Sequence, residues 1–445
     1  MNTPIYTFIK KYGEENKLRL HMPGHKGEGS LGVEKYDITE VDGADSLYNA
    51  SGIIAESESN ASGIFGSKTY YSTEGSSLSI RAMLYLVLNY AKENGENSWI
   101  FAGRNAHKSF ISAVALLDIK IKWLYGENDG YLSCKITPQS LENALQKAKR
   151  KPVAVYLTSP DYLGNVLDIE NISKVCKKYG VLLLVDNAHG GYLKFLEKSL
   201  FPIDLGADVC CSSAHKTLPV LTGGGYLHIS NEFFNRLSVN PKDALSLFGS
   251  TSPSYLIMAS LDLANLELSQ NYRQKLATFI NAVDGIKKEL IESGYALIGN
   301  EPLKITLSVK SYGYDGYEFN EILKEKGVIS EFYDPDFVCF MVTPNTGNGG
   351  LLTLKKVLLS IPRKEAKTEK MPTLSTPKRV MGIRKALFSV TEELKVEDCV
   401  GKILASPTVF CPPAVPIVSC GEIITENAVK VFKYYGINTC VVVKK

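Results

Sequence analysis

Cysteine patterns that bind metals or pair as disulfides are missing from this sequence. Its nine cysteines are scattered, with no C-x-x-C pair and no Cys/His cluster at the spacing of zinc ligands. The sequence therefore predicts reduced thiols and no metal site. It also lacks any apolar run of about 18 residues, the length that a membrane-spanning helix needs. The first ten residues include charge and have no signal-peptide core, so we expect a cytoplasmic protein.

An excess of charge of one sign is also absent. Fifty Lys and Arg face 47 Asp and Glu, a net charge of +3, which is too small to indicate nucleic acid or an anionic membrane as a partner. No Walker-type phosphate loop occurs. A hydrophobic share of 44% over 445 residues is typical of a globular protein with two or three domains.

The chain shows apolar runs that alternate with helical patterns. Runs at 99–102, 153–157 and 181–185 are purely apolar, and 119–124 is a further predicted strand. This alternation predicts an α/β fold whose mostly parallel strands are covered on both faces. The predicted domains are an N-terminal arm (1–40), a large domain (41–270), a small α/β domain (271–361), a linker (362–386) and a C-terminal domain (387–445).

Lys216 lies in a short turn between two predicted strands, at 208–211 and 226–229, beside Ser213 and His215. Most lysines are solvated surface cations. An amine that is kept partly dry has a lowered pKa and forms an imine with an aldehyde, which is how pyridoxal phosphate (PLP) is attached to proteins. Ser213 and His215 are then candidates to hold the cofactor's phosphate.

Asp186 directly follows the most apolar predicted strand, 30 residues before Lys216. A buried carboxylate is costly unless it meets a cation. A protonated pyridine nitrogen would be such a cation, and together with Lys216 the aspartate would make the PLP ring an electron sink.

Two further motifs have both a functional and a structural interpretation. Gly75-Ser76-Ser77 precedes a strong helical pattern, so it either binds an anion or only caps the helix. His107 follows a predicted strand end, where it either stacks on an aromatic cofactor or caps the next helix.

Motifs along nearly the whole chain carry a family resemblance. They are His21–Gly27 (HMPGHKG), Gly75–Ser77, Arg104–Ser109 (RNAHKS), Thr158–Pro160, Asp186–Gly190 (DNAHG), Ser213–Leu218 (SAHKTL), Ser250–Tyr255 (STSPSY), Pro412–Pro416 and Gly421-Glu422. The sequence resembles the bacterial ornithine/lysine/arginine decarboxylases of the aspartate-aminotransferase fold (fold type I), in their shorter form. The resemblance implies a large PLP domain with smaller C-terminal α/β domains.

The resemblance also implies roles for single residues. Lys216 would be the Schiff-base lysine and Asp186 the partner of the pyridinium nitrogen. His107 would stack on the ring, and His189 would lie beside it near the aldehyde. The phosphate would be held by Gly75, Ser76, Ser77, Ser213 and His215, with Thr251 or Ser252 reaching the phosphate of a partner subunit. We therefore expect a homodimer or a higher even assembly.

The sequence departs from the family pattern at Glu74, Asn187 and Tyr192, close to where substrate selectivity arises. The predicted reaction is decarboxylation of arginine, lysine or ornithine, in polyamine-related metabolism. Two alternatives stay open. An aminotransferase would need an arginine for the substrate carboxylate between 330 and 400, and no strand-flanked one is evident there. The other alternative is a family member that binds PLP without decarboxylase activity.

For Ser330–Asp334 we expect a solvated turn, and the alternative is that Glu331 recognises a basic substrate side chain.

Overall fold

The chain forms two compact units. A computed structural model describes residues 1–15, 17–96, 98–126, 130–373, 376–409 and 415–444. The first unit comprises Met1–Ser98, Arg150–Tyr156 and Ile169–Leu276, and the second comprises Trp99–Lys149, Leu157–Asp168 and Ala277–Lys445. Within the described ranges, no helix has both the length and the apolar character required to cross a bilayer.

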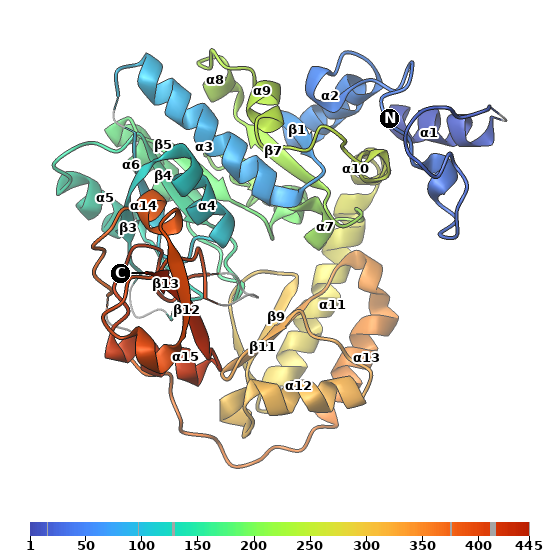
Figure 1. Ribbon diagram of the computed structural model, residues 1–445. Helices are drawn as coiled ribbons and strands as arrows, with labels where there is room; N and C mark the ends of the chain where they lie inside the picture. The colour runs from blue at the N-terminus through green and yellow to red at the C-terminus, as the bar shows by residue number, and fades with distance from the viewer. Residues whose placement is uncertain (16, 97, 127–129, 374–375, 410–414, 445) are drawn as a thin grey trace. The chain divides into compact units, whose positions relative to one another are not determined.

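The first unit contains a sheet with the strand order β1-β7-β6-β5 (Figure 1). β5 and β6 run parallel, whereas β7 is antiparallel to both of its neighbours. Its strands are β1 (Lys68–Ser72), β5 (Leu182–Asp186), β6 (Val209–Ser212) and β7 (Gly225–Ile229). Its helices are α1 (Pro4–Glu14), α2 (Ile53–Phe65), α3 (Gly75–Glu93), α6 (Ile169–Tyr179), α7 (Ala214–Thr217), α8 (Asn231–Phe234), α9 (Pro241–Ser246) and α10 (Tyr255–Ser269).

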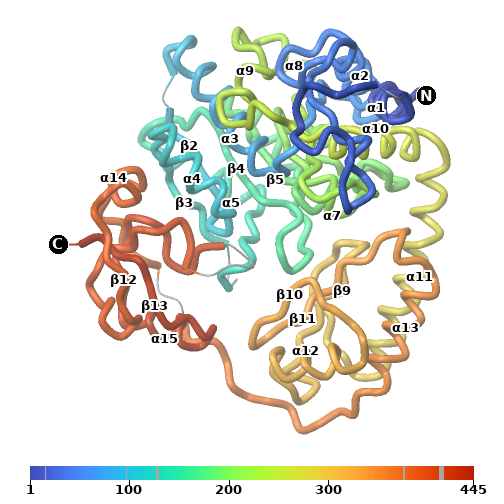
Figure 2. The backbone as a smooth tube through the Cα atoms, turned by 45° about the vertical axis from the view of Figure 1, so that its right-hand side comes forward, coloured from blue at the N-terminus to red at the C-terminus, as the bar shows by residue number. Residues whose placement is uncertain are grey.

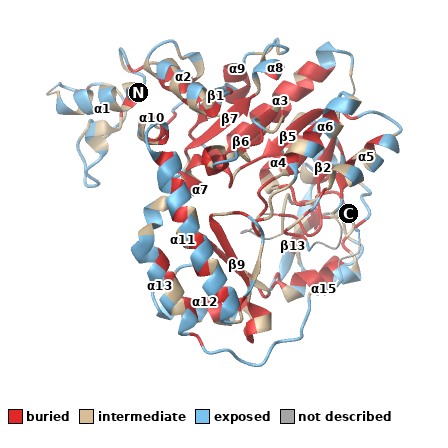
Figure 3. Ribbon diagram, turned by 180° about the vertical axis from the view of Figure 1, so that it is seen from behind, coloured by how far each residue is buried: buried red, intermediate tan, exposed pale blue. Residues whose placement is uncertain are grey.

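Strands β5, β6 and β7 are buried along their whole lengths (Figure 3). Helices pack on this sheet, as α3 does against β7 and β6. The Val, Leu, Cys and Tyr side chains of the three strands are therefore buried. The predicted strands at 181–185 and 208–211 are thus confirmed as β5 and β6. The polar residues that follow these strands are therefore attached to a buried sheet.

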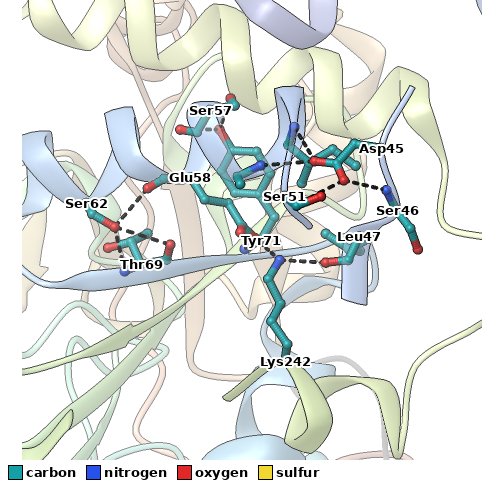
Figure 4. Close-up of polar contacts among 12 residues, drawn as sticks. Asp45, Ser46, Leu47, Ser51, Ser57, Glu58, Ser62, Thr69, Tyr71 and Lys242 are labelled. Carbon is teal, nitrogen blue, oxygen red and sulfur yellow. Dashed lines mark hydrogen bonds and ion pairs between the residues drawn. The ribbon is translucent and has the colours of Figure 1, made fainter. Parts of the chain in front are cut away.

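A buried polar network connects β1 with α2 and α9 (Figure 4). Lys242 Nζ is 2.6 Å from Glu58 Oε1 and donates to the carbonyl of Leu47 at 2.6 Å. The same Glu58 oxygen accepts the backbone N–H of Tyr71 at 2.8 Å. Only 9% of the Lys242 side chain and 7% of the Glu58 side chain are exposed, so each charge offsets the desolvation cost of burying the other. Their contacts join α9 to residues 47–71, from which Lys242 is distant in sequence.

The second unit holds three groups of strands. β2 (Trp99–Gly103) and β3 (Lys120–Leu124) pair in parallel. A four-stranded antiparallel sheet has the order β10-β11-β9-β8, from Phe332–Tyr333, Phe337–Met341, Lys304–Ser308 and Ala296–Ile298. β12 (Thr391–Lys395) pairs with β13 (Thr439–Val443). β4 (Ala154–Thr158) and α11 (Tyr272–Glu292) have residues in both units.

The helices of the second unit are α4 (Lys108–Leu117), α5 (Pro138–Gln146), α12 (Gly316–Glu325), α13 (Gly347–Leu359), α14 (Ile383–Leu387) and α15 (Glu426–Tyr434). α12 lies against β10 and β11 (Figure 2). The eight cysteines within the described ranges are buried and unbridged. Cys411 and the motif residues Pro412–Ala414 lie outside those ranges.

The turn at Ser330–Asp334 corrects one expectation. Glu331 is exposed, but Phe332–Tyr333 form strand β10 with Phe332 buried, and Asp334, the next residue, has no exposed surface. The expected solvated turn is therefore wrong for residues 332–334. Asp334 Oδ1 accepts the N–H groups of Asp336 and Phe337, both at 2.8 Å, and among the described residues Oδ2 has no partner. Because β10 pairs with β11, the carboxyl of Asp334 lies in the interior. The polar sequence around Asp334 does not indicate this burial.

Burial raises the pKa of Asp334 from 3.8 to about 7. In the unfolded chain the Asp334 carboxyl ionises near pH 4. Its protonated form therefore stabilises the folded state fully below pH 4, and this stabilisation is lost as the pH rises from 4 through 7. One pKa unit corresponds to about 1.4 kcal/mol, so the loss is on the order of 4 kcal/mol.

Asp334→Asn is therefore expected to reduce the fall in stability between pH 4 and pH 8, because asparagine keeps an oxygen for the two N–H groups without ionising. Urea unfolding of both proteins at pH 5 and pH 8 measures the difference. A variant whose unfolding midpoint follows the same pH dependence as the wild type would contradict this interpretation.

Candidate active site

Asp186 is the last residue of β5 and is only 2% exposed. Its carboxylate accepts hydrogen bonds from the Tyr156 hydroxyl at 3.1 Å, the Ala188 N–H at 3.2 Å and the Cys211 thiol at 3.6 Å. Burial and the nearby Asp186 raise the pKa values of Tyr156 and Cys211 well above their ordinary ranges, so both groups stay protonated donors. Within the described chain no ion pair includes this carboxylate.

Lys216 lies in α7, the helical turn that follows β6. The sequence predicted a sharply turning loop at this position, but residues 214–217 close one short helical turn because the Leu218 N–H reaches the Ala214 carbonyl at 2.8 Å. Lys216 is partly buried, and its Nζ is 2.9 Å from His189 Nε2. His189 is 6% exposed and lies three residues after Asp186. The structure therefore brings the predicted nucleophile and a predicted proton-handling group into direct contact.

Polar groups converge at the start of α3. The Ser76 N–H donates to Ser213 Oγ at 3.2 Å, and the Ser213 hydroxyl donates to Ser76 Oγ at 2.9 Å. Ser77 lies in the first turn of the same helix and is partly buried. The helix N-terminus favours an anion there through its dipole and its backbone N–H groups. Gly75 begins the same helix, so four of the predicted phosphate-binding positions (Gly75, Ser76, Ser77 and Ser213) lie together.

His215 reaches the same place from α7. Its Nδ1 donates to the Gly224 carbonyl at 2.9 Å. Burial lowers the pKa of His215, an effect that the Gly224 carbonyl opposes and Lys216 reinforces. The neutral ring then has its proton on Nδ1, and a phosphate placed near the ring would favour a second proton on Nε2.

A close approach of three backbone segments makes this cradle possible. The Gly75 N–H donates to the Gly223 carbonyl at 2.6 Å. A Cβ at Gly225 would lie 2.9 Å from the Gly75 carbonyl carbon and 3.0 Å from the Ser212 carbonyl oxygen. Glycine at 225 is therefore required for β7 to pass between the ends of β6 and α3. The Gly223–Gly225 run was visible in the sequence, but this contact was not.

His107 belongs to the second unit, where it is the N-cap of α4. Its Nδ1 accepts the Ser109 N–H at 3.2 Å and lies 3.0 Å from Ser109 Oγ. A backbone N–H can only donate, so Nδ1 is unprotonated and the neutral ring carries its proton on Nε2. The helix-cap interpretation is confirmed, and the stacking role stays a prediction.

Thr251 and Ser252 are exposed on the surface of the first unit. The segment is anchored by Glu74, whose carboxylate accepts the Ser250 N–H at 2.8 Å, and by the Ser252 N–H, which donates to Ser250 Oγ at 3.1 Å. Glu74, a departure from the family pattern, directly precedes α3, and its hydrogen bond to Ser250 connects the start of that helix to the exposed loop.

The other two departures are interior residues. Asn187 has no exposed surface, and its amide donates to Ser212 Oγ at 3.2 Å. Tyr192 also has no exposed surface. Asn187 directly follows β5, and Tyr192 lies in the short helical turn Gly191–Phe195. Because neither side chain is exposed, we expect an indirect effect on a substrate.

Tyr156 is the site residue that the sequence analysis missed. It lies in β4 between apolar neighbours, so the pattern indicated only a core position. The unusual feature is a hydroxyl in the middle of an otherwise apolar strand, and its donation to Asp186 explains that placement.

The arrangement fits PLP on three observations of this chain. A buried carboxylate has donors around it but no cation within the described residues, which suits a protonated ring nitrogen. A lysine amine lies next to an imidazole. A helix N-terminus meets two serines and a histidine, which suits a phosphate.

Comparison with known proteins adds two kinds of likeness. Residues 3–305 match the sequence model of the major domain of Orn/Lys/Arg decarboxylases. YaaO of Bacillus subtilis, an uncharacterised protein, is 30% identical, with 97% of this chain and 93% of that protein covered. An arginine decarboxylase of Halalkalibacterium halodurans is 29% identical, with 96% of this chain and 91% of that protein covered.

Among solved structures, a lysine decarboxylase from Francisella novicida superposes with a TM-score of 0.78 at 17% identity, over 99% of this chain and 81% of that one. At this identity the likeness establishes the fold. The predicted α/β fold of the type I class, with its mostly parallel central sheet, is confirmed.

Proposed function

Because this chain belongs to the Orn/Lys/Arg decarboxylase family and is a PLP-dependent amino-acid decarboxylase, we propose that it decarboxylates a basic amino acid. The candidates are arginine, lysine and ornithine, each giving CO₂ and the corresponding amine, in polyamine-related metabolism. Two residues carry the proposal: Asp186, which is buried and has no ion-pair partner among the described residues, and Lys216, which is in contact with His189.

PLP supplies an aldehyde that bonds to a lysine amine and a ring that accepts the electrons of a breaking Cα–carboxyl bond. In the proposed site Lys216 would hold the aldehyde carbon, and Asp186 would hold the ring-nitrogen proton. Ser76, Ser77 and Ser213 orient the phosphate together with His215 and the N–H groups at the start of α3. His107 would cover one face of the ring, as the family resemblance implies.

Lys216 and His189 also handle protons. Their nitrogen atoms are 2.9 Å apart, so a proton can pass between Nζ and Nε2 without a diffusing water. After CO₂ leaves, a proton must return to the substrate carbon, and either of these two atoms is the proposed donor. Tyr156 keeps Asp186 oriented through its hydroxyl and stays protonated because its pKa is raised by burial and by that aspartate.

We further propose a cytoplasmic homodimer, or a higher even assembly, in which Thr251 or Ser252 reaches the partner's phosphate. The exposure of both residues and the anchoring of their loop by Glu74 support this arrangement. The arginine decarboxylases among the relatives make arginine the first substrate to test.

The test is CO₂ release by the purified holoenzyme with arginine, lysine and ornithine in turn, together with the visible spectrum of the bound cofactor. We expect turnover of one of the three, and Asp186→Asn to lower it by about a hundredfold or more while the protein stays folded. A cofactor band without CO₂ from any of them would reject the proposed substrate class. A spectrum without a band after PLP addition would reject the cofactor site.

A further inference from the structure

Arg104 connects the C-terminal part of the chain to the turn before His107. It directly follows β2, and its guanidinium donates to the carbonyls of Pro416 at 2.9 Å and Ile417 at 3.0 Å. It also pairs with Glu422 at 3.0 Å, and only 12% of the Arg104 side chain is exposed. The planar group lies over the Trp123 ring, 5.3 Å from its centroid. One side chain thus holds a whole segment, residues 416–422.

Glu422 anchors the other side of this contact. It has no exposed surface, and its Oε2 accepts the Ser419 N–H at 2.6 Å in addition to the Arg104 bond. Burial raises the pKa of Glu422, and Arg104 opposes that shift. Gly421 turns the backbone at φ +87°, and a Cβ there would lie 2.3 Å from the Met381 carbonyl oxygen. The segment is therefore fixed in shape around the carboxylate.

The same C-terminal part binds the far end of α4. Arg384 of α14 donates to the carbonyls of Ala115 and Leu116, both at 2.9 Å. These are carbonyls at the C-terminal end of α4, where a cation is favoured by the helix dipole. α14 packs on α4, as Figure 1 shows. Residues that follow position 380 therefore contact the C-terminal end of α4 and, through Arg104, the turn that precedes this helix.

The connection from Arg104 to His107 is short and ordered. The Arg104 N–H donates to the Leu124 carbonyl at 2.9 Å, and the Ala106 N–H donates to the Gly103 carbonyl at 3.2 Å. Asn105 is 4% exposed. A tight turn of this kind transmits a displacement of Arg104 to His107, because only two residues lie between them.

We propose that Arg104 is a positioning residue for the cofactor site. By clamping residues 416–422 against the end of β2, it holds the 103–106 turn and so fixes the orientation of His107. The C-terminal segment thereby acts on the site without touching the reacting atoms. The inference rests on the proposed function, in which His107 covers the PLP ring.

Lysine cannot reproduce this contact. A guanidinium presents several donors in one plane, enough for two carbonyls and a carboxylate at once, whereas an ammonium is a single point charge. Arg104→Lys should therefore retain part of the effect, and Arg104→Gln should lose the charge as well. Glu422→Gln removes the charge pair but keeps an oxygen for the Ser419 N–H, so it tests the same clamp if Arg104→Gln folds poorly.

Arg379→Gln is the matched control. Arg379 donates to the Ile121 carbonyl in β3 at 2.9 Å, forms a backbone bridge with Glu422 and lowers the pKa of Glu422 by its charge. Its replacement therefore removes a guanidinium and a charge beside the same carboxylate but leaves the hydrogen bonds of Arg104 in place. Two measurements apply to all four variants. One is amide hydrogen exchange of peptides covering residues 103–110 in the cofactor-free protein, and the other is the Kd for PLP.

We expect Arg104→Gln to speed exchange in residues 103–110 by at least about tenfold and to weaken PLP binding by a similar factor. Arg104→Lys and Glu422→Gln should have intermediate effects, and Arg379→Gln should change either value less than about twofold. Equal effects of Arg104→Gln and Arg379→Gln, or none from either, would overturn the clamp. If the wild type binds no PLP, the proposed function fails, and the exchange data alone still decide whether the clamp holds the turn.

Discussion

Lys216→Ala is expected to abolish the covalent attachment of PLP and to lower decarboxylation by on the order of 10³-fold or more. The amine is the nucleophile for the aldehyde, and with His189, 2.9 Å away, it is also a proposed proton donor. Alanine removes both roles at once. The measurements are the visible absorbance band of the lysine-bound cofactor and the rate of CO₂ release from the substrate found active.

Lys198→Ala provides the control, because 81% of the Lys198 side chain is exposed and its removal should leave both measurements unchanged. Lys216→Arg separates charge from nucleophilicity: it keeps a cation beside His189 but should be as inactive as alanine. Retention of the band in Lys216→Ala would show that another amine holds the aldehyde, and the proposed site would then be wrong.

Lys242→Met is expected to cost about 3–5 kcal/mol of folding free energy, the usual penalty for leaving one buried charge without its partner. Glu58 lies 2.6 Å from the ammonium and is buried with it (Figure 4). Burial already raises the pKa of Glu58, and the charge of Lys242 opposes that rise. Without the lysine the pKa rises further. The destabilisation should therefore be larger at pH 8 than at pH 5, where the carboxyl is more readily protonated.

The double variant Glu58→Gln/Lys242→Met should recover part of the loss, because the glutamine oxygen can still accept the Tyr71 N–H. Lys174→Met breaks an exposed pair with Glu170 and should cost less than about 1 kcal/mol. Urea unfolding at the two pH values measures all three. A Lys242→Met protein within 1 kcal/mol of the wild type at pH 8 would contradict the dependence of this pair on burial.

The positions of the candidate cofactor residues were predictable because they are local features. Asp186 ends an apolar strand, Lys216 follows the next strand in the chain, and Gly75 opens a helix. Parallel strands bring their carboxyl ends to one edge of a sheet, so β5 and β6 place Asp186 opposite Cys211 and near α7. For His107 the sequence predicted either a helix cap or a stacking residue, and the structure confirmed that it caps α4.

The contacts that join distant segments were not predictable. Glu58 and Lys242 are 184 positions apart, and Arg104 and Glu422 are 318 positions apart. Each is an ordinary polar residue in its local context. The partner of a charge, and the depth at which the pair lies, depend on which segments the fold brings together.

The sequence by itself determined the alternation of strands and helices, the order of the strand-end residues and the chemistry that this order suits. These follow from periodicity and from the few residue types that PLP requires. The tertiary structure decided that Asp334 is buried, that Tyr156 orients Asp186 and that residues 416–422 close on Arg104. The physical reason is that burial and long-range pairing set the cost of each charge, and neither property belongs to a local stretch of sequence.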